Sequence, residues 1–142
     1  MKLTSLWICA AFLALVCSVF AEPVPKILSD GMDLYKKDGA AKALAFLLAG
    51  SPVENNTTAI VNQVGNLNAI ESAYGKFLGY ETVGVVSFSK SAKRYYLVML
   101  YEKGPFYSWF EVYSGGGKEI ITSFDCNTKV NAILPDSFFQ KQ

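Results

Sequence analysis

One stretch of the sequence, residues 80–127, constrains the fold most strongly, because short aromatic and β-branched segments alternate in it with turn signals. The segments are residues 80–89, 93–102, 105–113 and 118–126. Aromatic and β-branched side chains suit the pleated surface of a strand. The links between the segments are residues 90–92, 103–104 and 114–117. Connections this short require antiparallel neighbours, so the stretch predicts a four-stranded antiparallel sheet.

Charged residues indicate which face of this sheet meets water, because strand side chains alternate between two faces. Arg94 and Glu102 share one side of the second segment, Glu111 lies on one side of the third, and Glu119 and Asp125 share one side of the fourth. The uncharged sets are therefore expected to face the core. They are Tyr95, Leu97, Met99 and Tyr101; Phe106, Ser108, Phe110 and Val112; and Ile120, Thr122, Phe124 and Cys126.

The first segment of the sheet is harder to orient, because Gly84 interrupts it. A glycine inside a strand often marks a bulge or a bend. Glu81 is expected on the wet side, which indicates that Thr82, Val86 and Phe88 point inward.

The outer, charged face of the sheet carries many apolar side chains among few charges. They are Tyr96, Val98, Leu100, Trp109, Tyr113 and Ile121. Contiguous apolar patches usually mark contact surfaces, and Trp and Tyr are enriched at interfaces. We therefore predict that this face forms a homodimer or binds another protein. Two alternatives remain open, namely a second layer of the same chain over this face and an open platform for a ligand.

Ahead of the sheet the sequence predicts three helices. Residues 27–36 and 40–49 form a helical hairpin around a Lys-Asp-Gly turn, because the second unit is rich in Ala and Leu and stops at Gly50-Ser51-Pro52. The third helix starts at capping residues 55–58 and ends at Tyr74-Gly75. Its apolar residues follow helical spacing, so we expect it to lie across the inner face of the sheet.

Two features flank these elements. Residues 131–142 carry Ile133, Leu134, Phe138 and Phe139 and are expected to tuck in as a tail or a single turn. Asn55 and Asn56 each begin an N-x-Thr sequon, which has a meaning only in a eukaryotic secretory pathway.

Residues 1–21 are typical of a cleaved signal peptide. Lys2 precedes an apolar run at residues 6–16, and Val19-Phe20-Ala21 lies where a signal peptidase cuts. The run is short for a transmembrane helix, and no later uncharged stretch reaches spanning length. We therefore expect an exported product, periplasmic or extracellular, with one domain at residues 22–142 and no transmembrane segment. Lipid attachment at Cys17 is the alternative, although Leu15 and Val16 suit it poorly.

The charge and cysteine content argue against several classes of partner and against a disulfide within the chain. With Lys2 removed, the 13 basic residues become 12, equal to the 12 acidic ones. A neutral chain without runs of like charge lacks the electrostatic footprint for nucleic acid or an anionic membrane. Cys9 and Cys17 leave with the signal peptide, so Cys126 has no disulfide partner within the chain. On the predicted core face it is expected to be a buried hydrophobic residue rather than a reactive thiol.

The chain contains no histidine. This excludes Ser-His-Asp and Cys-His hydrolysis and His-ligated zinc, and one cysteine cannot build a thiolate metal site. The glycine-rich segments 103–105 and 114–118 lack the spacing and the following helix of a phosphate-binding loop, so we predict hairpin turns there. No catalytic residue, metal ligand or cofactor is predicted.

The order of elements resembles that of small exported bacterial proteins of unknown function with a cystatin-like or nuclear-transport-factor-2-like α+β cone. Residues 74–81 look like the link from helix to strand in such proteins, and residues 101–105 with 109–113 look like their central hairpin. The resemblance covers nearly all of residues 22–142. It implies an α+β fold with N-terminal helices packed on one face of a four-stranded antiparallel sheet. This architecture hosts isomerases, dehydratases, binding modules and subunit-assembly domains.

In enzymes of that fold the cone holds a pocket with an acid or a histidine and often a tyrosine. The inward residues of this chain are large and apolar, so the resemblance favours a non-enzymatic binding or accessory protein. One alternative is a pocket for a small apolar ligand, lined by Tyr95, Met99, Tyr101 and Phe110. The other is a histidine-free isomerase or dehydratase that uses a tyrosine and a carboxylate.

Overall fold

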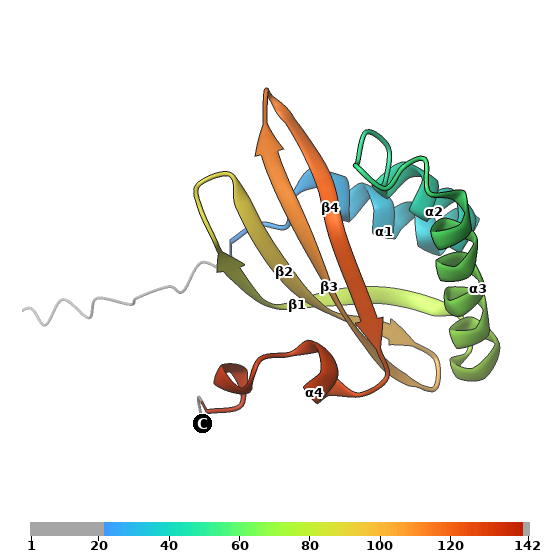
Figure 1. Cartoon of the computed structure of the whole chain (residues 1–142). Helices are drawn as coiled ribbons and strands as arrows, with labels where there is room; N and C mark the ends of the chain where they lie inside the picture. The colour runs from blue at the N-terminus through green and yellow to red at the C-terminus, as the bar shows by residue number, and fades with distance from the viewer. Residues whose placement is uncertain (1–21, 141–142) are drawn as a thin grey trace, which may run out of the picture.

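A computed structural model describes residues 22–140, so the predicted signal peptide lies outside the described residues. The elements are α1 Lys26–Asp38, α2 Ala40–Leu47, α3 Thr57–Tyr74, β1 Phe77–Ser87, β2 Ala92–Tyr101, β3 Gly104–Gly115, β4 Lys118–Asn127, α4 Val130–Ile133 and the 3-10 turn η1 Asp136–Phe138. Figure 1 shows the first three helices on one side of a strongly twisted sheet and the C-terminal segment on the other. The predicted α+β fold is confirmed.

The four strands form one antiparallel sheet in the order β1-β2-β3-β4, as the short links predicted. The link between β3 and β4 consists of Gly116 and Gly117, both with positive φ angles of 60° and 77°. Two residues with positive φ are what a type I′ hairpin turn requires, and glycine adopts them without steric cost. The glycine-rich segment is therefore a hairpin turn.

The helices cover the inner face of the sheet and close the main core. Gly39, with φ 86°, separates α1 from α2 and produces the predicted helical hairpin. Asn56 caps α3 by accepting a 3.1 Å hydrogen bond from the amide of Ala59, and Gly75 ends it with φ 83°. These positions match the predicted cap and closing glycine. Leu97 of β2 is fully buried under this helical layer.

The side chains of β1 do not alternate regularly between the two faces of the sheet along its whole length. The pairing of β1 with β2 shifts between Thr82 and Gly84, so Val83 is an extra residue. Thr82 faces inward opposite Leu97, as predicted, but Val86 lies opposite Arg94 on the outer face. The prediction that Val86 and Phe88 point inward was therefore wrong, because a bulge reverses the alternation beyond it.

The side chains of β4 also change faces at an extra residue. The register with β3 shifts where Thr122 is extra, which places Ile121 opposite Val112 and Ile120 opposite Tyr113. Ile121 is fully buried in the main core, so its predicted place on the outer face was wrong. Ile120, predicted to face inward, lies on the outer side for the same reason.

The C-terminal segment, residues 130–140, packs on the outer face of the sheet. Tyr96, Ile133 and Leu134 form a small buried cluster there, separate from the main core. Val86, Tyr107, Trp109, Val130 and Phe138 are partly buried against it. The expected tail is confirmed, and it partly covers the outer face as the second-layer alternative described. Within the described part of the chain, no helix is long and apolar enough to cross a membrane.

Candidate functional site

The outer face of the sheet is the candidate site, and the C-terminal segment divides it. Phe138 packs edge-on against Tyr96, with ring centroids 5.0 Å apart. The same ring lies over Gly84, where a Cβ atom would stand 2.8 Å from its Cζ. Tyr96 is consequently only 4% exposed and cannot contact a partner while this segment is in place.

Beside the covered part lies a group of side chains that we call the Arg94 cluster. It comprises Arg94, the three residues that contact it, Phe88, Trp109 and Glu111, and Tyr113, which follows Glu111 on the same face of β3. The Arg94 guanidinium lies 4.2 Å from the Trp109 ring centroid and 5.4 Å from that of Phe88. Its Nε donates a 3.1 Å hydrogen bond to Glu111 Oε1, and Nη2 forms an ion pair with the same oxygen. The charge of Arg94 is thus neutralised within the face.

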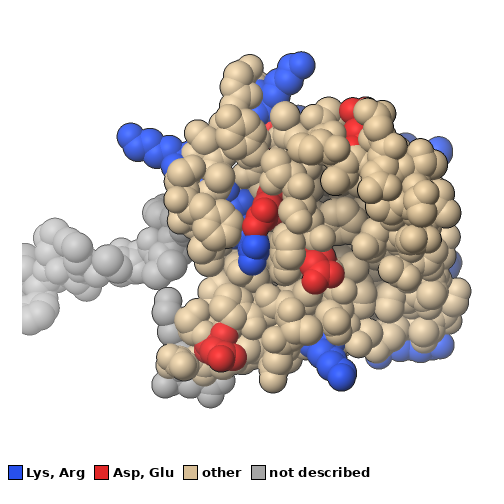
Figure 2. All heavy atoms as spheres, in the orientation of Figure 1, with Lys and Arg blue, Asp and Glu red and all other residues tan. Residues whose placement is uncertain are grey.

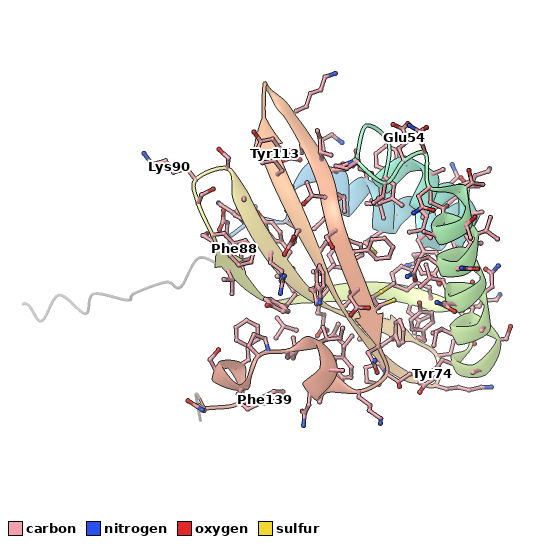
Figure 3. The ribbon with its side chains drawn as sticks, in the orientation of Figure 1. Glu54, Tyr74, Phe88, Lys90, Tyr113 and Phe139 are labelled. Carbon is pink, nitrogen blue, oxygen red and sulfur yellow. The ribbon has the colours of Figure 1, made fainter. Side chains whose placement is uncertain are left out.

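Two aromatic residues of this cluster are open to solvent. Phe88 is 56% exposed and Tyr113 is 45% exposed. Both lie toward the hairpin tips and away from Phe139 on the C-terminal segment, as Figure 3 shows. The Tyr113 ring lies against the backbone of Gly115, where a Cβ atom would come within 2.4 Å of its Cε1. A glycine is therefore needed there for this ring position.

Few charges interrupt the surface around the site. Figure 2 shows a face that is mostly uncharged, with isolated acidic and basic side chains and one adjoining pair of opposite sign. Val98 and Leu100 are half-buried on the outer side of β2, opposite Glu81 and Gly79 of β1.

The six residues predicted for the interface thus have different positions. Trp109 and Tyr113 belong to the Arg94 cluster, Val98 and Leu100 lie farther along β2, Tyr96 is covered, and Ile121 is in the core.

Sequence reasoning missed Phe88 and Arg94. Gly84 was the signal for the bulge that turns Phe88 outward. Alternation alone places Arg94 on the same face as Trp109 and Glu111, and so indicated their contact.

The four residues predicted for a ligand pocket do not line one cavity. Met99 and Phe110 border an internal cavity of about 20 Å³, together with Ser108 and Cys126. This is on the order of the space for one water molecule, so no small organic ligand fits. Tyr95 borders a different hollow of about 260 Å³ at the surface beside residues 22–25.

The remaining predicted pocket residue, Tyr101, is part of a buried tyrosine pair. Its hydroxyl lies 3.0 Å from that of Tyr35. Burial raises the pKa of Tyr35 to about 12, and burial followed by the hydrogen bond to Tyr35 raises the pKa of Tyr101. Among residues 22–140, no carboxylate hydrogen-bonds either hydroxyl. Both phenols stay protonated at neutral pH, so neither can act there as a base.

Cys126 is also held in its neutral form. Burial, with a smaller contribution from Asp125, raises the pKa of its thiol to about 11. Because the thiolate is the nucleophile and metal ligand, this thiol is unreactive at neutral pH. Within the described part of the chain, no three His, Cys, Asp or Glu residues are grouped so that they could hold a metal ion.

No protein-family model matches the chain, and neither curated proteins nor solved structures contain a significant match.

Proposed function

We propose that this protein is an exported, non-enzymatic binding protein that self-associates through the outer face of its sheet, with the Arg94 cluster at the centre of the contact. The observation that carries the proposal is the exposure of Phe88 and Tyr113 beside the Arg94–Trp109 stack. Trp, Tyr and Arg dominate the residues that contribute most to protein–protein binding.

The electrostatics of the cluster suit burial against a partner. An unpaired charge at an interface is costly to remove from water, whereas a paired one costs much less. Arg94 is paired with Glu111 and stacked on Trp109 before any partner arrives. A second protein can therefore cover it without leaving a charge unsatisfied.

Both edges of the sheet argue for contact through the face rather than through strand addition. β1 carries irregularities between Phe77 and Gly79 and between Thr82 and Gly84, and β4 carries one at Thr122. Bulges twist an edge away from regular pairing, which is one way that proteins prevent edge-to-edge association.

The proposal includes an exported location and a cystatin-like or nuclear-transport-factor-2-like cone. The signal-like pattern of residues 1–21 supports the first, and the packing of three helices on one face of a four-stranded antiparallel sheet is compatible with the second.

The test is native mass spectrometry of the protein recovered from its export compartment, combined with light scattering over a concentration series. We expect a dimer mass. Tyr113→Asp and Leu100→Asp should each weaken the dimer at least tenfold, which corresponds to about 1.4 kcal/mol. Val61→Asp on α3 is the matched control, because Val61 is 62% exposed and lies outside the outer face.

Equal dissociation constants for all three variants would show that the outer face is not the contact. A monomer mass increased by the mass of a bound small molecule would contradict self-association and indicate ligand binding instead.

A further inference from the structure

We infer that the C-terminal segment, residues 130–140, is an exchangeable element that docks on the outer face of a second copy of this chain. We call this segment the tail. The inference rests on the proposed self-association and specifies how the two copies are joined.

The tail packs in a cluster of its own, apart from the main core. Its buried residues, Ile133 and Leu134, cluster with Tyr96 on the outer face and not with the helical layer. Detaching the tail therefore uncovers part of the outer face and leaves the main core closed. A segment with this independence can leave its own sheet without unfolding the domain.

The surface under the tail has a shape that fits the Phe138 ring. The bulge at Val83 brings Gly84 opposite Tyr96, and together they form a notch that receives the Phe138 ring. A side chain at position 84 would clash with that ring. Each copy carries both a tail and a notch, so two copies can exchange tails reciprocally. Such exchange gives a closed twofold dimer and stops there.

The hinge for this exchange is short. β4 ends at Asn127 and α4 begins at Val130, so Thr128 and Lys129 alone reverse the chain onto its own sheet. The reversal is held by the Lys129 amide, which donates a 2.9 Å hydrogen bond to Asn127 Oδ1. When the backbone of these two residues straightens, the tail points away from its own sheet. The packing that the tail gives up in this step is restored on the partner.

Trp109 connects the two parts of the proposed dimer. It packs against the tail's cluster and also stacks on Arg94. An exchanged tail therefore places the partner next to Phe88 and Tyr113, where a new interface can form. This additional interface favours the dimer, since the exchanged tail itself only reproduces the packing it had on its own sheet. Charge does not oppose the exchange, because Asp136 is the single ionisable side chain in residues 130–140.

The experiment mixes isotope-labelled and unlabelled copies of the full protein and incubates them at high concentration until subunits have exchanged. Filtered nuclear Overhauser spectra then report only contacts between different copies. We expect such contacts between the Phe138 ring and Gly84 or Tyr96, together with a dimer mass. Asn127→Ala should strengthen the dimer by at least about fivefold, because the hydrogen bond from the Lys129 amide to Asn127 Oδ1 holds the hinge only in the closed chain. Asn131→Ala is the matched control, because Asn131 is exposed and lies in α4, beyond the hinge.

The outcomes separate this inference from the proposed function. A dimer whose Phe138–Gly84 contacts are all within one copy overturns tail exchange and leaves association through the face intact. A monomer at every concentration overturns both. Equal dissociation constants for the Asn127 and Asn131 variants would show that the hinge does not open in the dimer.

Discussion

At the scale of single residues, Ser108 is the polar exception in the main core. It is fully buried, and its hydroxyl has no hydrogen-bond partner among residues 22–140. It lies opposite Cys126 across β3 and β4 and borders the 20 Å³ cavity. A buried hydroxyl without a partner costs about 1–3 kcal/mol. We predict that Ser108→Ala raises the free energy of unfolding by about 1 kcal/mol, as measured by urea denaturation.

Ser51 provides the matched comparison. It is also buried, but its Oγ accepts a 3.2 Å hydrogen bond from the amide of Val53. Ser51→Ala should lower the free energy of unfolding by about 1 kcal/mol, because the amide loses its partner. If Ser108→Ala destabilised the protein as much, its hydroxyl would have to be satisfied, for instance by a water molecule in the cavity.

At the scale of elements, two helical glycines have opposite roles. A Cβ atom at Gly31 of α1 would stand 2.3 Å from Leu47 Cδ2 of α2, whereas one at Gly65 of α3 would meet no atom within 4 Å. We predict that Gly31→Ala destabilises the protein by about 1–3 kcal/mol through overpacking. Gly65→Ala should stabilise it by about 1 kcal/mol, because alanine favours the helix. Thermal unfolding followed by circular dichroism measures both changes.

Helical propensity alone would give the two variants the same sign. Stabilisation of both would therefore mean that α1 and α2 separate easily at Gly31 and that their close packing contributes little.

The order of elements could be predicted because each strong local signal agrees with the final fold. Asn56 and Gly75 mark the ends of α3 in sequence and in structure. The face of the sheet on which each side chain lies could not be predicted beyond the bulges, because one extra residue moves every later side chain of that strand to the opposite face. Gly84 hinted at the bulge at Val83, whereas Thr122 is an ordinary strand residue and gave no signal of the bulge in β4.

At the scale of the whole molecule, the candidate site depends on a long-range contact that local patterns do not encode. Alternation placed Tyr96 and Trp109 on the outer face correctly. It could not tell that the tail returns over Tyr96 and leaves Trp109 at the boundary. The Arg94 cluster is therefore a product of one bulge in β1 and of where the tail stops.

The main core as a whole should be sensitive to alkali. The pKa values of Tyr35, Tyr101 and Cys126 are all raised by burial, to about 12 for Tyr35 and about 11 for Cys126. The unfolded chain releases these protons near its ordinary pKa values of 9.0 and 10.0, while the folded chain keeps them. Unfolding therefore releases protons above about pH 9, and the free energy of unfolding falls as pH rises.

Urea denaturation between pH 8 and about 12 measures this fall. Cys126→Ala should make the profile shallower between about pH 9 and 11, because the thiol no longer contributes. Tyr35→Phe should have its effect between about pH 10 and 12, since phenylalanine has no proton to release. A wild-type profile that stayed level to pH 11 would mean that these groups ionise as readily in the folded chain as in the unfolded one. The main core would then admit water around the Tyr35–Tyr101 pair and Cys126.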